Sequence, residues 1–87
     1  MEKGYRFLAV APSAGIGRVI EETAASKKGI QVTVRVGSLQ QGVEIVQAVA
    51  DTDYDAIVAR GATARMIKEV SRLPVIEIRI SFYDILQ

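Results

Sequence analysis

Short apolar segments alternate with amphipathic helical segments along this chain, and that order constrains its fold more than any other feature. The predicted strands are the segments 5–11, 31–36, 56–59 and 75–80. Three predicted helices fill the intervals between them, and Ser81–Gln87 is predicted to begin a fourth. Such alternation is typical of a parallel sheet joined by right-handed crossovers. The 87 residues suffice for a single α/β lobe, residues 1–87.

The second predicted strand has the pattern of an edge strand, and this gives the predicted strand order. Val32, Val34 and Val36 alternate with Gln31, Thr33 and Arg35, so only one face is expected to be covered. The first and third strands are continuous apolar runs, as buried central strands are. The prediction is an α/β fold with three layers, a Rossmann-like or flavodoxin-like parallel sheet with strand order 2-1-3-4.

The helical segments carry apolar stripes and boundary signals. Ser38 is predicted to cap the second helix, Gly29 to stop the first, and Pro74 to end the third. The predicted inward positions are Ile16, Val19, Ile20, Thr23 and Ala24, then Leu39, Val43, Val46 and Ala50, then Met66, Ile67 and Val70.

The chain has neither cysteine nor histidine, which excludes several function classes. Disulfides, thiolate nucleophiles, Cys/His metal sites and histidine acid–base or phosphorelay chemistry are not available. The net charge is +1 and the arginines are scattered, so no basic surface for nucleic acid is indicated. We therefore expect no enzyme activity, no catalytic residue, no metal and no cofactor.

No apolar run approaches the ~20 residues that span a bilayer, so we expect no membrane partner. The stretch 7–20 resembles the core of a signal peptide, but Pro12 and Ser13 interrupt it. The sequence therefore favours a cytoplasmic protein.

In a sheet of this order, ligands bind outside the carboxyl ends of the strands, where the winding reverses. That crevice is expected between the first and third strands, facing the loops Pro12–Gly17, Arg60–Thr63 and Ser81–Asp84. The predicted ligand-binding residues are Ser13, Arg60, Gly61, Ala62, Thr63, Ser81 and Tyr83.

Arg60, Gly61 and Thr63 have the chemistry of an anion site. Arg60 ends a strand, and a guanidinium can hold a carboxylate with two donors. Gly61 permits close backbone approach, and Thr63 adds a hydroxyl where the helix dipole favours negative charge. A simpler interpretation fits equally well, in which Thr63 only caps the helix and Arg60 is solvated.

The segment Pro12–Gly17 is open to three interpretations. Gly15 and Gly17 resemble part of a dinucleotide fingerprint, but Ile20 occupies the third glycine position and Arg35, not an acid, ends the next strand. Small residues also ease a tight turn, or let an anion approach a helix start. Farther along, Glu77 and Arg79 are predicted to form a polar strand face opposite Ile76 and Ile78.

Three blocks resemble the sensory N-terminal domain of propionate-catabolism activators, which are sigma-54-dependent transcriptional regulators. The blocks are 55–64 (DAIVARGATA), 73–78 (LPVIEI) and 81–86 (SFYDIL), and Gly37-Ser38-Leu39 before a helix also fits. The departures are Ala59 for serine, Ala62 for the second glycine and Phe82 for glycine. Ala59 lacks a hydroxyl that could face a ligand, and Phe82 puts a ring at the hinge between lobes, so the ligand need not be the family's 2-methylcitrate.

The resemblance implies one lobe of a two-lobed domain like a periplasmic binding protein, excised from a longer regulator. It implies a small-molecule effector-sensing module that binds an anionic metabolite, such as a carboxylate. DNA and sigma-54 RNA polymerase would be contacted only by other domains. Two alternatives stay open: a nucleotide-binding enzyme domain of Rossmann type, and a protein–protein docking module without a ligand.

The predicted topology also leaves one sheet face under-covered. With right-handed crossovers, the first helix covers one face alone, while the second and third cover the other. Soluble monomers rarely expose a large apolar patch. We therefore expect a homodimer in which each chain covers the other's open face or exchanges its C-terminal segment.

Overall fold

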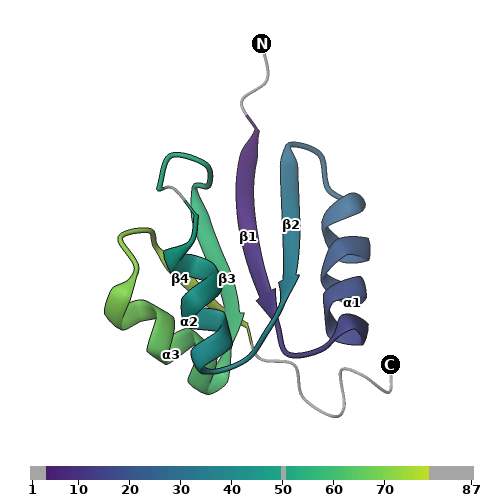
Figure 1. The fold of residues 1–87 in the computed structure, drawn as a ribbon. Helices are drawn as coiled ribbons and strands as arrows, with labels where there is room; N and C mark the ends of the chain where they lie inside the picture. The colour runs from purple at the N-terminus through teal and green to yellow at the C-terminus, as the bar shows by residue number, and fades with distance from the viewer. Residues whose placement is uncertain (1–3, 50, 79–87) are drawn as a thin grey trace.

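The computed structural model describes residues 4–49 and 51–78, which form a parallel sheet with helices on both faces (Figure 1). In chain order the elements are β1 (Tyr5–Ala11), α1 (Ala14–Ala25), β2 (Ile30–Val36), α2 (Gln40–Gln47), β3 (Ala56–Arg60), α3 (Gly61–Val70) and β4 (Val75–Ile78). The strand order is β2-β1-β3-β4, and each neighbouring pair is parallel. The predicted fold class and strand order are therefore confirmed.

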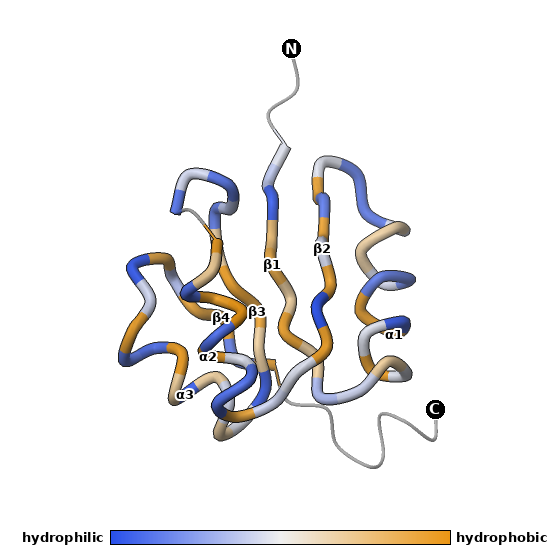
Figure 2. The backbone as a smooth tube through the Cα atoms, viewed as in Figure 1, coloured by the Kyte–Doolittle hydropathy of each residue, from blue (hydrophilic) through white to orange (hydrophobic). Residues whose placement is uncertain are grey.

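The pleat of the sheet sorts its side chains onto two faces. Leu8 lies opposite Ile57, and Ile57 lies opposite Val75, so these three share the face covered by α2 and α3. This face holds the main core, whose buried members are Leu8, Val10, Val43, Val46, Ile57, Ala59, Ala64 and Ile67. Figure 2 shows the hydrophobic colouring concentrated along the middle of the sheet and on the sides of α2 and α3 that meet it.

The other face of the sheet is covered by α1, which lies over β1 and β2 (Figure 1). Close approach is possible because Gly17 has no side chain: an added Cβ there would lie 2.8 Å from Val34 Cγ1. Among the described residues, α1 is the only helix on this side. Beside it runs a hollow of about 430 Å³, called here the open groove, lined by Phe7, Val19, Ile20, Thr23, Ala24, Lys27, Ile30, Val32, Val58 and Ile78.

The edges of the open groove carry exposed apolar side chains. Ile76 on β4 is 45% exposed, Val19 on α1 is 51% exposed, and Tyr5 on β1 is 55% exposed. The Tyr5 and Phe7 rings stack with their centroids 6.5 Å apart. The predicted under-covered face is thus present in the described part of the chain.

Several details of the predicted helices were wrong. Val19 and Thr23 in α1, predicted to face inward, are exposed. The residue that precedes α2 is Leu39, not Ser38, and it makes no side-chain capping hydrogen bond. Leu39 is 50% exposed rather than part of the buried stripe, because the chain turns sharply there before the helix begins. Val70, predicted to face inward, is 44% exposed at the last position of α3. Ala50 lies outside the described residues.

Two other predicted stop signals lie beyond the helix ends that they were expected to mark. The first helix ends at Ala25, four residues before Gly29, which has the positive φ of 79° expected at a stop signal. Pro74 follows α3 and directly precedes β4, although the helix itself already ends at Val70. Glu77 and Ile76 lie on opposite faces of β4, as the alternation predicted, whereas Arg79 lies outside the described residues.

Candidate functional site

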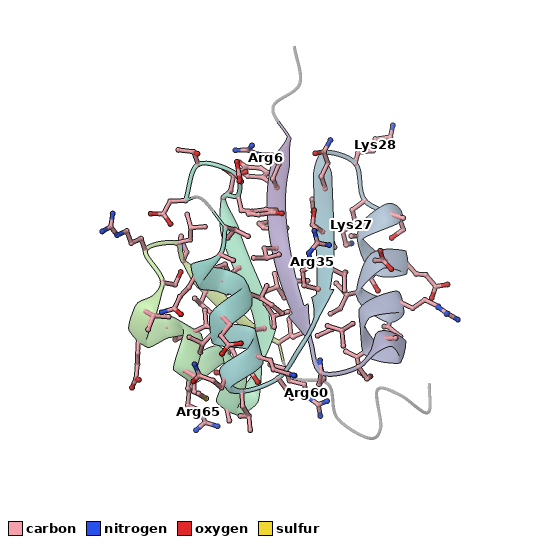
Figure 3. All side chains as sticks on the ribbon, in the orientation of Figure 1. Arg6, Lys27, Lys28, Arg35, Arg60 and Arg65 are labelled. Atoms are coloured by element: carbon pink, nitrogen blue, oxygen red, sulfur yellow. The ribbon has the colours of Figure 1, made fainter. Side chains whose placement is uncertain are left out.

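A hollow of about 220 Å³ lies at the edge where the parallel strands end, called here the carboxyl edge. Its lining residues are Val10, Pro12, Arg60, Gly61, Ala62 and Thr63. They come from the end of β1 and the residue after it, from the end of β3, and from the first turn of α3; β1 and β3 are the two strands between which the crevice was predicted. Figure 3 shows Arg60 and Arg65 at this edge, while Arg6 and Lys28 lie at the opposite one.

Arg60 and Gly61 join β3 to α3 without an intervening loop. Arg60 is the last residue of the strand and, with an extended backbone (φ −123°, ψ 136°), also the N-cap of the helix. Gly61 has a φ of 52°, a conformation that residues with a Cβ rarely adopt, and no atom lies within 4 Å of the position a Cβ would take. The helix start is therefore open to an approaching group.

The first turn of α3 carries no side-chain cap, because Arg60 makes no capping hydrogen bond. Its N–H groups consequently present the positive end of the helix dipole to the hollow. The partly buried Arg60 side chain adds a full positive charge beside it. This arrangement can hold an anion by charge-assisted hydrogen bonds.

Thr63 lines the hollow but is not the cap of α3. Its hydroxyl accepts a hydrogen bond from the Leu39 N–H at 2.9 Å, and only 9% of the residue is exposed. Its methyl group faces Gly42, where an added Cβ would lie 2.6 Å from Thr63 Cγ2. The interpretation of Thr63 as a mere helix cap is therefore wrong, since Thr63 connects the chain before α2 to the first turn of α3.

Ser13 directly follows Pro12, which lines the hollow, but its hydroxyl caps α1. It is the N-cap of α1, and its Oγ accepts from the Ile16 N–H at 3.3 Å. Gly17, in the same segment, is buried against β2. Gly17 thus serves helix packing, whereas Gly15 is exposed.

Of the remaining predicted site residues, the structure describes only Ala62. Ser81 and Tyr83, with the departure at Phe82, lie outside the described residues. Ala62 is exposed and lines the hollow. Ala59 is fully buried in the core on the α2–α3 side, so the missing hydroxyl at that position would not have faced the hollow.

Leu39 is the residue near this site that the sequence did not indicate. Its N–H binds Thr63, and its φ of 53° is unusual for leucine. No motif signals a positive φ at a leucine, and only the preceding Gly37-Ser38 hinted at a sharp turn.

The other hollows have less suitable surroundings for an anion. One of about 280 Å³ lies between the C-terminal ends of α2 and α3, where helix carbonyls disfavour negative charge. The open groove is larger but almost wholly apolar. Within residues 4–49 and 51–78, no cluster of three or more acidic side chains could hold a metal ion. None of the helices in that part of the chain is long and apolar enough to cross a bilayer.

Comparison with known proteins gives a family match and a structural match. The family model described as propionate catabolism activator matches residues 26–87. A crystal structure of an NtrC family transcriptional regulator from Clostridium acetobutylicum superposes with a TM-score of 0.78 at 22% sequence identity. The alignment covers 93% of this chain and 42% of that chain, so this chain spans less than half of that regulator's chain. Curated protein sequences give no match.

Proposed function

This chain belongs to the propionate catabolism activator family, and from that premise we propose that it is an effector-sensing lobe that binds an anionic metabolite at its carboxyl edge. The observation that carries the proposal is the pairing of Arg60 with the uncapped start of α3 around one hollow. Both groups favour negative charge at the same place. A carboxylate suits them because the planar guanidinium offers two parallel donors.

The proposal places this lobe in a sigma-54-dependent transcription activator whose other domains contact DNA and polymerase. It assigns no catalytic step to the lobe. Among the described residues, the side chains that line the hollow are an arginine, a threonine and apolar groups, which suit binding of an anion.

A thermal-shift comparison of organic acids with nucleotides tests this function class. Citrate at about ten times its dissociation constant should stabilise the fold by about 1.4 kcal/mol, which raises the melting temperature by roughly 5–10 °C. ATP and NAD at the same concentration should give a smaller rise, because the described residues that line the hollow include no aromatic side chain on which a base could stack. Chloride at matched ionic strength is the control. A rise with a nucleotide alone would favour the Rossmann-type enzyme domain instead.

We propose further that a second copy of this chain covers the open groove. Among the described residues, α1 is the only helix on that side of the sheet. Val19 lines the hollow, Ile76 on β4 pairs with Val58 of its lining, and both are exposed. In a twofold dimer, the same surface of each copy forms the interface. The apolar edge of one copy would therefore pack into the open groove of the other. A stable interface of this kind needs at least ~1,000 Å² in total.

Replacing Ile76 by aspartate should separate the two copies. We expect light scattering to give the mass of a dimer for the wild type and of a monomer for Ile76→Asp, because the new carboxylate would lose its water in the interface. Val70→Asp is the matched control: Val70 is 44% exposed against 45% for Ile76, but it lies on α3 at the other face. A wild-type monomer at high concentration would rule out the second copy as the occupant.

A further inference from the structure

The outer edge of β2 lacks the features that normally keep a strand edge from pairing with another chain. β2 stands at one end of the sheet, and none of the described strands pairs with its outer side (Figure 1). All seven of its residues are in register with β1 without a bulge, it contains no proline, and Arg35 is its only charged residue. Edge strands are usually protected by short length, bulges, prolines or several charges. The outer edge of β2 is therefore open to a further strand.

The hydrogen bonds to β1 show which backbone groups of β2 face outward. Gly37, directly after the strand, donates its N–H to the Ala11 carbonyl of β1. Backbone groups alternate between the two edges of a strand, so those of the odd-numbered residues of β2 face β1. The N–H and C=O groups of the even-numbered residues face outward; these residues are Ile30, Val32, Val34 and Val36.

One side of α1 lies beside this edge. Glu21 and Ala25 line a hollow of about 270 Å³ that includes residues of β2 but of no other strand. The open groove lies on the other side of α1 and reaches Val58 and Ile78, so the two surfaces are separate. Exposed residues spaced by four, three and four positions form the side of α1 next to β2; they are Ala14, Arg18, Glu21 and Ala25.

The packing of α1 on β2 fixes how the helix and the strand are aligned. Gly17 packs against Val34. One turn later, Glu21 shares its hollow with Val32. The helix therefore runs antiparallel to the strand, and Thr33, between the two valines, is level with the middle of α1. A twofold axis at Thr33 would pass between the two helices of a pair as well as between the two strands.

The strand edge is complementary to itself about that axis. In an antiparallel pair centred on Thr33, Val32 of one copy lies opposite Val34 of the second copy. Their outward N–H and C=O groups can exchange two hydrogen bonds. On the face away from α1, Arg35 lies opposite Gln31 of the second copy, so no like charges meet. The exposed guanidinium would exchange its long 3.4 Å contact with the Val34 carbonyl for that amide.

The helices are complementary about the same axis. Arg18 of one copy lies opposite Glu21 of the second copy, and the axis repeats this pair of opposite charges. The small side chains of Ala14 and Ala25 meet at the two ends, where they allow close approach of the helices. A register centred on Val32 instead would place Glu21 opposite an acidic residue, Glu22, so the charges favour Thr33.

We propose that two copies of this chain pair through their β2 edges, antiparallel about Thr33, to form one continuous sheet with α1 packed on α1. The contact is separate from the open groove and smaller, since one strand edge and one helix side meet in each copy. Interfaces below about 1,200 Å² are typical of weak association. Edge pairing is therefore expected at high protein concentration, between the dimers that the open groove forms.

Sedimentation equilibrium of the Ile76→Asp protein isolates the edge pair, because that variant is expected to lack the open-groove contact. Its mass should be that of a monomer at about 20 µM and should approach that of a dimer at about 1 mM. Adding Arg18→Glu should raise the dissociation constant roughly tenfold, since both symmetry-related charge pairs become repulsive. Reversing both charges, Arg18→Glu with Glu21→Arg, should return the constant to within about threefold. Arg65→Glu, the same charge change on α3, is the matched control.

Val32→Pro tests the strand contact in the same background. It removes an outward N–H without removing a bond to β1, so the mass should stay that of a monomer at the higher concentration. Pairing that survives Val32→Pro, or that the double charge reversal fails to restore, would overturn the proposal. A monomer at both concentrations before either change would overturn self-pairing and leave the edge to an extended strand of a different protein. If Ile76→Asp is already dimeric at the lower concentration, the open-groove dimer is contradicted, and the edge pair stands or falls on whether Val32→Pro makes that dimer a monomer.

Discussion

Ile67→Ala is expected to lower the free energy of unfolding by about 2–5 kcal/mol, the range for truncating a fully buried aliphatic side chain. Ile67 is 0% exposed and lies on α3 at the centre of the core, among Leu8, Val10 and Ile57. The cost is large because truncation leaves a cavity that a parallel sheet and two packed helices cannot close. A domain of 87 residues has a total stability of only about 4–13 kcal/mol. Urea denaturation followed by circular dichroism measures the difference.

Val70→Ala is the matched control, three residues along the same helix. Val70 is 44% exposed, so truncation should change the free energy of unfolding by no more than about 0.5 kcal/mol, helped by the higher helix propensity of alanine. The pair also tests how the helix faces the core, since the apolar pattern alone placed both residues inward. Equal losses for the two variants would mean that α3 is rotated from the orientation described.

The strands and their order followed from the sequence because hydrophobic patterning is a strong physical signal. The continuous apolar runs in β1 and β3 belong to central strands, each paired on both edges, and the alternation in β2 belongs to an edge strand. The right-handedness of the crossovers then decides which helix lies on which face of the sheet, so the under-covered face was also predictable. Errors fell at helix ends, where Leu39 rather than Ser38 precedes α2 and where Leu39 and Val70 are exposed rather than buried.

The candidate site was predictable in place but only partly in detail. Arg60 at the end of a strand and Gly61 directly after it form a local pattern that the sequence shows by itself. Both residues line the hollow. The Thr63–Leu39 hydrogen bond joins positions 24 apart, so no local pattern could indicate it. The same limit applies to Ala59, whose side of the strand depends on the register with β4.

Arg60→Ala should weaken citrate binding by about 1.5–3 kcal/mol, the range for hydrogen bonds to a charged group, which is a loss of roughly 10- to 150-fold in affinity. The reason is that the guanidinium supplies a full positive charge at a hollow where, among the described lining residues, the other polar donors are backbone N–H groups and one hydroxyl. Arg65→Ala is the control, because it removes the same charge from an exposed position on α3. Solvent screening should limit its effect to about threefold or less.

Calorimetric titration of citrate into the wild type, Arg60→Ala and Arg65→Ala tests anion binding at the carboxyl edge most directly. Melting temperatures recorded alongside verify that all three proteins are folded. The account predicts saturable binding to the wild type, nearly the same affinity for Arg65→Ala, and an affinity at least about tenfold lower for Arg60→Ala. Equal affinities of the wild type and Arg60→Ala, or no binding to the wild type at all, would contradict it.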